Sequence, residues 1–495
     1  MNLRIAIQTL CFGLTILNSS HAAASDLTIE GALFHTDKHP HKEDPATRAF
    51  VEFWVEWKNA WRNERNHDSV WVFLKLRGMD SIGVPITRHA TIVGEPEFLN
   101  VDDKVGSPRM EIRVSNDRTG FFIEPVRPYR GDVRVKIRAA IDPAGLEGFG
   151  IETLRASAYG IEMVYIPEGP FSAGAAGEAA LEYGAYYLST GDNAFGGPYR
   201  ITNENEITVG PEAGMLSYRP ELASVHMGDA EGPIPSAFPK GFNAYYMMKY
   251  ELTQGQYANF LNDIDYFGAD LRANFGGRTY YDDRGTIRRE GNIYVADSPD
   301  RPANFVSWED GIAFLDWAAL RPMTDFEFDK AARGPHTPSA DEYVWGTTST
   351  SQVERFILRN GDVGMLNGAS ESELTDSTRE QFAASYYWVM DLSGSLWERV
   401  VTIGDAAGRA FTGIHGDGDI SAWGEATAAH WPRELGSPRS KKGFGYRGGG
   451  FYDEGGHYDL YRPHSPVAYR PFGNWSGGPR HRAYGFRGVR SANDK

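Results

Sequence analysis

The chain has 495 residues, of which 41% are hydrophobic and 13% aromatic, so it is long enough to form two or three globular domains with buried cores. Its formal net charge of −16 at pH 7 disfavours binding to nucleic acid or to anionic lipid headgroups, because both carry negative charge. The 56 glycines and 27 prolines favour an architecture rich in strands and loops over a helical bundle.

The N-terminus has the pattern of a secretory signal peptide. Arg4 precedes an apolar run over residues 5–17, and small residues follow at Ala22 and Ala24. The run is too short to span a bilayer, and no later stretch contains about 18 consecutive apolar residues. We therefore predict a signal peptide over residues 1–24, no membrane span, and a mature protein that is secreted, periplasmic or held at the cell surface.

The cysteine content limits the chemistry of the mature protein. The only cysteine is Cys11, which lies inside the predicted signal peptide. After cleavage the protein is expected to contain no disulfide, no thiolate nucleophile and no cysteine-ligated metal.

Residues 25–158 have the pattern of an all-β domain. Apolar residues recur two positions apart in several short segments that are separated by turn-forming residues. These segments are FVEFWVEW, VWVFLKLR, MEIRVS and DVRVKIRAAI. The pattern predicts a β-sandwich, and it contains no catalytic constellation.

A second unit is predicted over residues 159–490, followed by a tail at 491–495. Residues 172–235 are rich in Gly, Ala and polar residues with little periodicity, which indicates an irregular surface insertion. Three amphipathic helices follow, each with a helix-capping signal. These signals are Thr253 with Gln256, Ser307 as an N-cap, and Thr324 with Glu327. The remainder reads as short strands and long glycine-rich loops.

Seven ordered blocks in the second unit resemble the formylglycine-generating enzyme family, also called the sulfatase-modifying factor family. They are MVYIPEGPF, YELTQGQYANFL, VSWEDGIAFLDWAALRPMTDFEFDKAARG, YVWG, MDLSGSLWERV, YRGGGF and YGFRGVR. The resemblance covers about residues 159–490. It implies an α+β fold related to C-type lectins, with many irregular loops, preceded here by the all-β sandwich domain.

The chain departs from the family at the loop that begins YRGGGF. In the family's oxidases, the resemblance implies, this loop supplies one serine and two cysteines that bind copper and attack the substrate cysteine. Gly450 stands at the serine position, and Asp453 and Tyr458 stand at the cysteine positions. Three residues keep the family's pattern: Arg447, Tyr461 and Arg462. Because Cu(I) prefers thiolate ligands, we expect no copper and no formylglycine-generating oxidase activity.

A second departure concerns calcium. The resemblance implies that the block MDLSGSLWERV helps to hold a calcium ion through an Asn and a Glu. Ser395 replaces the Asn, and Glu398 keeps the carboxylate. A serine hydroxyl is a poorer ligand for a hard cation than an amide oxygen. The alternatives are a structural calcium ion at Ser395 and Glu398, or a hydrogen-bonded turn.

Three functions remain open. The first is a ligand-binding protein without catalysis, which uses the C-terminal loops to bind an extracellular or envelope protein or a glycan. Its candidate binding residues are Tyr452, Asp453, His457, Tyr458, Arg462, Trp475 and Arg480. The segment around Trp475 and Arg480 is turn-rich and polar, so both side chains are predicted to be available to a ligand. A related alternative is a structural component of a cell-surface assembly.

The other alternative is an enzyme that works without thiols. Asp453, Glu454 and His457 lie within five residues and could act as acid, base or ligands of a non-haem metal such as Fe(II) or Zn(II). Whether the chain is an enzyme is therefore left open by the sequence.

Overall fold

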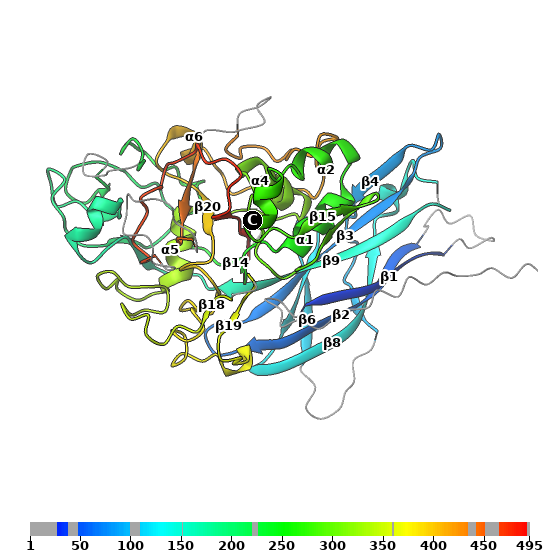
Figure 1. Cartoon of the computed structure of the whole chain (residues 1–495), viewed down its shortest axis with the longest axis horizontal. Coiled ribbons are helices and arrows are strands. Elements are labelled where there is room, and N and C mark those ends of the chain that lie inside the picture. Colours follow the sequence, from blue (N-terminus) through cyan, green and yellow to red (C-terminus); the bar gives the residue numbers. More distant parts are fainter. Residues whose placement is uncertain are drawn as a thin grey trace, which may run out of the picture.

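The fold is mixed, with strands more abundant than helices and a large share of loops (Figure 1). The computed structural model describes residues 27–37, 48–99, 109–150, 152–219, 226–358, 361–433, 442–450 and 465–492. Long strands gather on one side of the molecule, and short helices and loops gather on the other. The predicted signal peptide and residues 451–464 lie outside the described residues.

The first eight strands form two sheets. One sheet has four strands in the order β1-β2-β8-β5, and the other begins with β6, β7 and β3, with β4 paired to β3. All the strand pairs among these eight are antiparallel. Their bounds are β1 Thr28–Asp37, β2 Arg48–Arg62, β3 Asp68–Met79, β4 Pro85–His89, β5 Glu97–Phe98, β6 Met110–Val114, β7 Phe121–Pro125 and β8 Tyr129–Ile141; a short 3-10 helix, η1, follows at Pro143–Leu146.

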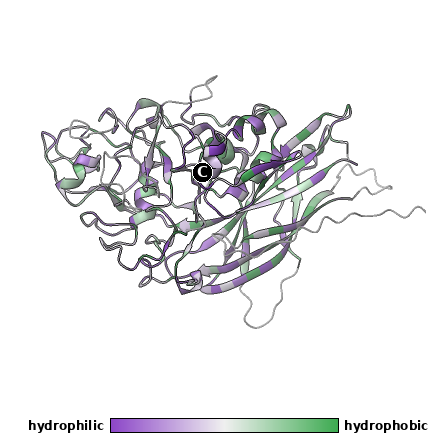
Figure 2. Cartoon of the chain, viewed as in Figure 1, coloured by the Kyte–Doolittle hydropathy of each residue, from purple (hydrophilic) through white to green (hydrophobic). Residues whose placement is uncertain are grey.

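The two sheets share one hydrophobic core, as the alternating pattern predicts. Hydrophilic and hydrophobic residues alternate along several long strands (Figure 2), which gives those strands one apolar face, whereas β3 is buried on both faces. The buried side chains from β2, β8 and β3 include Val51, Phe53, Val55, Val135, Ile137, Val70, Val72 and Leu74. Burial of each large apolar side chain contributes about 1.5–3 kcal/mol to folding.

Strand β9 (Arg155–Ile166) joins the N-terminal sheet to the rest of the molecule. One edge of β9 pairs with β3, from Arg155 opposite Arg77 to Val164 opposite Asp68. The other edge pairs with β14 (Tyr245–Met248). A strand has two hydrogen-bonding edges, so β9 belongs to both units at once. The predicted boundary between residues 158 and 159 therefore lies inside a strand of a continuous eight-stranded sheet.

The remaining strands are short. Strands β14, β23 and β17 extend the large sheet beyond β9, and β20, β21 and β22 form a three-stranded sheet near the C-terminus. The bounds are β10 Phe171–Ala173, β11 Tyr187–Leu188, β12 Tyr199–Ile201, β13 Leu216–Ser217, β15 Ile287–Glu290, β16 Ile293–Ala296, β17 Arg321–Pro322, β18 Arg355–Ile357, β19 Val363–Met365, β20 Trp397–Val401, β21 Phe444–Arg447, β22 Tyr484–Gly485 and β23 Gly488–Ser491.

The three predicted helices are present with their predicted caps. Capping boxes close the N-termini of α1 (Gln254–Asp263), α4 (Trp308–Trp317) and α5 (Asp325–Arg333), at Thr253, Ser307 and Thr324. The other helical segments are α2 Tyr266–Arg272, α3 Arg278–Asp282, α6 Ala406–Arg409, η2 Glu178–Tyr183 and η3 Glu371–Glu373. In the described ranges, none of the helices reaches the length and apolar character that crossing a bilayer requires.

Residues 172–235 were predicted to form an irregular surface insertion, and the structure differs from that prediction. Their described part contains two antiparallel strand pairs, β10 with β12 and β11 with β13. Its aromatic side chains Tyr186 and Tyr218 are buried in the main hydrophobic core, together with Leu216 and Ile234. The low periodicity arises because the strands are too short to show alternation, although their apolar residues still point into the core.

Candidate functional site

The candidate site lies at the end of β21. It is built from the residues that flank 451–464, the segment that contains five of the seven predicted binding residues. Gly448 and Gly449 have positive φ angles of 93° and 84°, which favour glycine. A Cβ atom at Gly449 would lie 2.4 Å from Ser465 Oγ, so the two chain ends that flank 451–464 are in contact. Five predicted binding residues lie outside the described residues: Tyr452, Asp453, His457, Tyr458 and Arg462.

Arg447, the last residue of β21, anchors this position in the core. Its fully buried guanidinium pairs with Asp325 and Asp329 of α5 and donates to the carbonyl oxygen of Val467 at 2.6 Å. Arg470 adds a second guanidinium to Asp325, at 3.0 Å. Burial raises the pKa of Asp325, but the two guanidiniums outweigh that effect and the pKa is lowered. The carboxylate is therefore ionised and holds both arginines in place.

Gly450 lies against Trp397, the first residue of β20. A Cβ atom at Gly450 would lie 2.9 Å from Trp397 Cδ1 and 3.3 Å from the carbonyl oxygen of Ala483. Real Cβ atoms do not approach carbon so closely, so a larger residue at 450 would have to displace the indole. Trp397 is buried and fills the space that the side chain of a serine at this position would enter.

A cluster of aromatic side chains surrounds Trp397. We define the aromatic cluster as Trp397, Phe472, Trp475, Tyr446 and Tyr484. Adjacent ring centroids lie 4.7–5.9 Å apart, from 4.7 Å between Tyr446 and Tyr484 to 5.9 Å between Trp475 and Tyr484. These spacings and the tilted or edge-on geometries are those of favourable aromatic pairs, each contributing about 0.5–1.5 kcal/mol beyond area burial.

The guanidinium of Arg399 packs against two rings of the aromatic cluster. Its guanidinium lies 5.0 Å from the ring centroid of Tyr446 and 5.4 Å from that of Tyr484. It also donates to the carbonyl oxygens of Gly478 and Pro479, at 3.2 and 3.0 Å. Burial raises the pKa of Tyr446 to about 12, so the phenol stays neutral. The cluster is thus a rigid, neutral surface with Phe472, Trp475 and Tyr484 only partly buried.

The exposure of Trp475 differs from the prediction that it is an exposed loop residue. It is half-buried and packs against the main core, with Phe472 at 5.3 Å and His226 stacked at 6.2 Å between centroids. The flanking glycines and polar residues gave a misleading signal, because short loops can fold an aromatic ring back onto the core. Trp475 contacts Phe472, which contacts Trp397, the residue that lies against Gly450.

Arg480 is occupied within the protein, contrary to the expectation that it is available to a ligand. Its Nε and Nη2 atoms bind the two carboxylate oxygens of Asp310 at 2.6 and 2.8 Å. It also donates to the carbonyl oxygens of Asn274 and Leu271, at 2.8 and 2.9 Å. Four of its five N–H groups are therefore used to join the end of α2 to α4.

The residues expected at a calcium site are also held by protein partners. Glu398 forms a bidentate pair with Arg487, with both N–O distances 2.7 Å. The Ser395 hydroxyl donates to Glu251 Oε2 at 2.5 Å. The guanidinium of Arg487 thus contacts both carboxylate oxygens of Glu398, and the Ser395 hydroxyl is hydrogen-bonded to Glu251. Within the described ranges, no group of three or more His, Cys, Asp or Glu residues could hold a metal ion.

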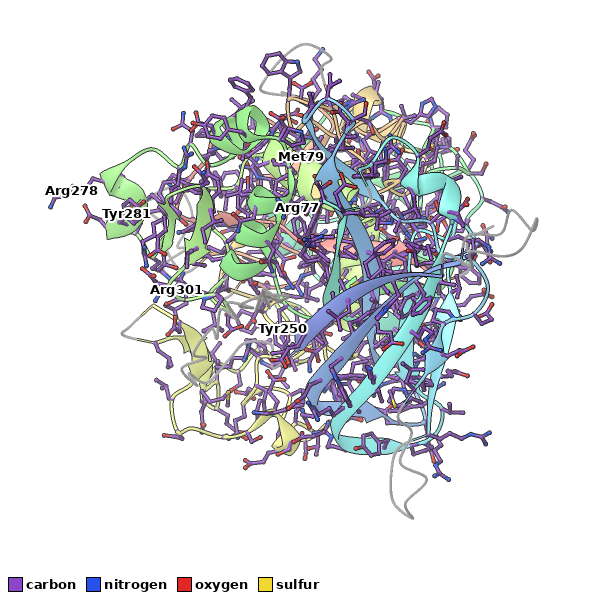
Figure 3. The ribbon with its side chains drawn as sticks, turned by 90° about the vertical axis from the view of Figure 1, so that its right-hand side faces the viewer. Arg77, Met79, Tyr250, Arg278, Tyr281 and Arg301 are labelled. Carbon is purple, nitrogen blue, oxygen red and sulfur yellow. The ribbon has the colours of Figure 1, made fainter. Side chains whose placement is uncertain are left out.

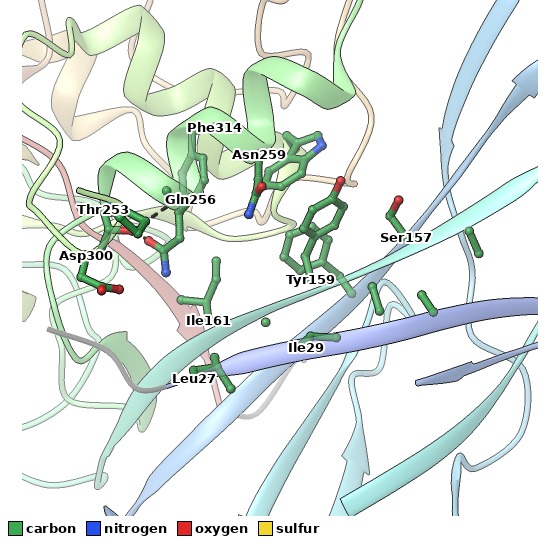
Figure 4. A pocket seen from close by; sticks show the side chains of 18 residues that line it. Leu27, Ile29, Ser157, Tyr159, Ile161, Thr253, Gln256, Asn259, Asp300 and Phe314 are labelled. Carbon is green, nitrogen blue, oxygen red and sulfur yellow. Dashed lines mark hydrogen bonds between the residues drawn. The ribbon is translucent and has the colours of Figure 1, made fainter. Parts of the chain in front are cut away.

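A pocket of about 430 Å³ lies elsewhere, between β1 and β9 on one side and α1 and α4 on the other (Figure 4). Two of its polar side chains make hydrogen bonds within the fold. The Gln256 carbonyl oxygen accepts from the backbone N–H of Thr253, and the Tyr159 hydroxyl donates to Asp263. The pocket is therefore explained by the way β1 crosses β9 beneath the helices, and it offers little directed chemistry.

Comparison with known proteins identifies the relatives of this chain. A family model described as a sulfatase-modifying factor enzyme 1-like domain matches residues 155–492. The formylglycine-generating enzyme of Thermomonospora curvata is 28% identical over 105 residues, which cover 21% of this chain and 34% of that protein. The enzymes of Streptomyces coelicolor and Mycobacterium tuberculosis are 27% and 28% identical over 105 and 116 residues. The chain spans about a third of the length of these curated relatives.

The sequence interpretation did not select four members of the aromatic cluster: Trp397, Tyr446, Phe472 and Tyr484. Trp397, Tyr446 and Tyr484 come from three blocks that are far apart in the chain, and strand pairing brings them together, whereas Phe472 lies between the second and third of these blocks. In the three-stranded sheet, Trp397 is paired with Tyr484, and Arg399 is paired with Tyr446. For Trp397, Tyr446 and Tyr484, the aromatic positions within the blocks SLWERV, YRGGGF and YGFRGVR were the available signal.

Proposed function

Since the chain belongs to the sulfatase-modifying factor enzyme 1-like family, whose model matches more than half of it, we propose that it is an exported family member that binds a ligand and does not generate formylglycine. The aromatic cluster forms the described part of the binding surface, and the proposal adds to it the predicted binding residues within 451–464. The ligand is a protein or a glycan outside the cytoplasm. The fold of residues 159–490 is the C-type-lectin-like fold that the family resemblance implies.

The loss of oxidase chemistry follows from the residue types. Asp453 and Tyr458 stand at the two cysteine positions, and Cys11 is the only cysteine in the sequence. A carboxylate and a phenol cannot supply the thiolate ligands that Cu(I) prefers, nor a thiol for disulfide exchange with a substrate cysteine.

The single observation that carries the proposal is the contact between Gly450 and Trp397. The family's serine hydroxyl has no counterpart here, and the indole of Trp397 occupies the space beside the backbone. The position therefore lacks the family's hydroxyl and lies against the ring of Trp397. Partly buried aromatic rings on a rigid base provide contact area at a low cost in conformational entropy, which suits recognition.

Two assays on purified protein test the proposal. We expect no copper-dependent loss of thiol from a peptide that carries a sulfatase-type cysteine motif, relative to a heat-inactivated control. We also expect Phe472→Ala to weaken capture of envelope glycans or proteins by about tenfold or more, whereas Leu366→Ala on a distant exposed surface leaves capture unchanged. Turnover of the peptide thiol, or equal capture by both variants, would overturn the proposal.

Export is tested separately. Expression of the full chain in a bacterial host with fractionation is expected to yield a periplasmic or secreted form whose intact mass begins at Ser25. An intracellular protein that retains Cys11 would contradict this part and leave the binding proposal standing.

A further inference from the structure

A row of exposed aromatic side chains lies on α2 and on the turn at 421–426. Tyr266, Phe267 and Trp423 are 55%, 67% and 64% exposed. The ring centroids of Tyr266 and Phe267 lie 5.7 Å apart, and those of Phe267 and Trp423 lie 6.4 Å apart. We define these residues as the exposed aromatic row. Large apolar side chains are usually buried, so a contiguous group of them at the surface indicates an interaction site.

The two segments that carry the row are joined by close backbone packing. A Cβ atom at Gly268 of α2 would lie 2.7 Å from the backbone nitrogen of Gly424. Gly424 has a φ angle of 70°, which favours glycine. The buried guanidinium of Arg272 donates to the carbonyl oxygen of Gly424 at 2.9 Å. The backbones that position the rings are therefore fixed before a ligand arrives, which lowers the entropy cost of binding.

Side-chain contacts hold both ends of the row. In the turn, Ser421 Oγ accepts from the backbone N–H of Trp423 at 3.2 Å. At the other end, Arg289 donates to the Tyr266 hydroxyl at 3.2 Å, and its guanidinium lies 4.8 Å from the ring centroid of Tyr266. These contacts keep the rings at the surface in one arrangement.

The area of the row is too small for a stable interface between proteins. Aromatic side chains offer about 150–250 Å² each, so exposed fractions of 55–67% leave roughly 300–450 Å² open in total. Leu271, one turn along α2, is 41% exposed and adds less than any of the rings. A standard protein interface buries about 800 Å² on each partner. The row fits a short oligosaccharide better, because the C–H faces of sugar rings stack on aromatic rings while the hydroxyls stay in water.

The charged side chains beside the row carry both signs. The acidic residues of the turn, of α2 and of its N-cap are Glu425, Asp270 and Asp265. The arginines that donate to these segments are Arg272, Arg289, Arg433 and Arg480. Arg272 and Arg480 are paired with the buried carboxylate of Asp310. A membrane-binding surface concentrates Lys and Arg beside its aromatic residues, whereas carboxylates lie beside this one, so the charges favour a ligand without net charge.

The angles between the rings favour a flexible glycan. The ring planes meet at 74° between Tyr266 and Phe267 and at 49° between Phe267 and Trp423. The flat face of a crystalline polysaccharide needs coplanar rings, whereas a single soluble chain can turn between one ring and the next. We propose that the exposed aromatic row is a binding site for a soluble, neutral oligosaccharide chain. The site is independent of the proposed function, because the row shares no residue with the aromatic cluster or with 451–464.

Calorimetric titration of the full protein with maltohexaose, cellohexaose, laminarihexaose and N-acetylchitohexaose tests the proposal. At least one of them is expected to bind in the micromolar to millimolar range. Trp423→Ala and Phe267→Ala should each raise Kd about tenfold or more, as removal of a central aromatic contact typically does. Both variants should stay folded, because the rings are mostly exposed. Trp423→Phe keeps an aromatic ring and should retain most of the affinity.

The matched control is Tyr281→Ala, which should leave Kd unchanged. This ring is 54% exposed, packs against Tyr280 of α3 and lies at the outer edge of the molecule (Figure 3). Failure of all the oligosaccharides to bind overturns the proposal. Oligosaccharide binding that Trp423→Ala leaves unchanged also overturns it, and loss of that binding in Phe472→Ala then places the sugar at the aromatic cluster.

Two further measurements distinguish other occupants of the row. The first is co-sedimentation with vesicles of phosphatidylcholine and phosphatidylglycerol, and the second is the sedimentation-velocity mass of the protein over a range of concentrations. We expect no vesicle binding and no self-association that depends on Trp423. Vesicle binding or dimer formation that Trp423→Ala abolishes, without oligosaccharide binding, would replace the glycan by a membrane or by a second copy of the chain.

Discussion

Glu398 and Arg487 face each other across the interior, with two parallel hydrogen bonds of 2.7 Å and both side chains fully buried. Arg487 also donates to the carbonyl oxygens of Met248, Lys249 and Met390. The pair therefore ties β20 to β14 and to the segment before β20. The guanidinium cation of Arg487 therefore lies at the carboxylate of Glu398, where the sequence left a structural calcium ion as one of two alternatives.

Neutralising Glu398 should destabilise the protein strongly. Glu398→Gln leaves the Arg487 charge buried without its counter-charge, which costs about 3–5 kcal/mol of unfolding free energy. Urea unfolding measures the loss. The matched control is Asp282→Asn, which breaks a helical ion pair with Arg278 at the outer edge of the molecule (Figure 3), where the two side chains are 63% and 91% exposed. That change should cost under about 0.5 kcal/mol.

Metal removal gives a second check on the same pair. Because Arg487 neutralises Glu398, treatment with EDTA should leave Tm unchanged, and added calcium should not raise it. A Tm that falls with EDTA and recovers with calcium would show that a cation binds here after all.

Trp475→Ala should cost about 2 kcal/mol of unfolding free energy. The ring packs against the core and the aromatic cluster, but it is only half-buried, so the loss should be smaller than the ~3–5 kcal/mol typical of a fully buried Trp. Trp423→Ala is the control, because that ring is 64% exposed, and its removal should cost under about 0.5 kcal/mol. Equal losses for the two variants would mean that Trp475 is not part of the core.

Replacing Gly450 by serine should strain the aromatic cluster. The new Cβ meets Trp397, and overpacking of this kind typically costs about 1–3 kcal/mol. In a Trp397→Leu background the same Gly450→Ser change should cost less, which a double-mutant cycle measures. Gly177→Ser is the control, since its Cβ would meet only Ala340, at an ordinary 3.6 Å. Equal costs in the two backgrounds would contradict the contact.

Lys75 should give the protein a stability that increases with pH in the alkaline range. Its Nζ donates to the carbonyl oxygen of Gly418, which joins β3 to the loop after α6. Burial lowers the pKa of Lys75 from 10.5 to about 8, although four neighbouring aspartates act in the opposite direction. Between pH 8 and 10.5 the unfolded chain therefore binds more protons than the folded protein, so stability rises with pH; below pH 8 the full penalty for the buried charge remains.

The variant that isolates this effect is Lys75→Met. The unfolding free energy of the unmodified protein minus that of Lys75→Met should increase by roughly 1.4 kcal/mol per pH unit between pH 8 and 10. Lys58→Met, at an exposed position of β2, removes a lysine without removing a buried ammonium. If the difference in unfolding free energy between the unmodified protein and Lys75→Met does not change with pH, Lys75 titrates in the folded protein as it does in the unfolded chain.

Local structure and the residue types at the expected site can be read from the sequence alone. Capping boxes at Thr253 and Thr324 and the alternation in β2, β3 and β8 predicted elements that the structure contains, because caps and side-chain periodicity act over a few residues. The replacement of two family cysteines by Asp453 and Tyr458 is likewise a property of residue types alone.

The contacts of each side chain, by contrast, depend on the tertiary fold. The shared strand β9, the aromatic cluster around Trp397, and the pairing of Arg480 with Asp310 join residues that are tens to hundreds of positions apart. A polar local sequence predicted that Trp475 and Arg480 are available to a ligand, yet burial depends on which distant segments fold over them. Long-range strand pairing and buried ion pairs set those contacts, and neither has a signature within a short window of sequence.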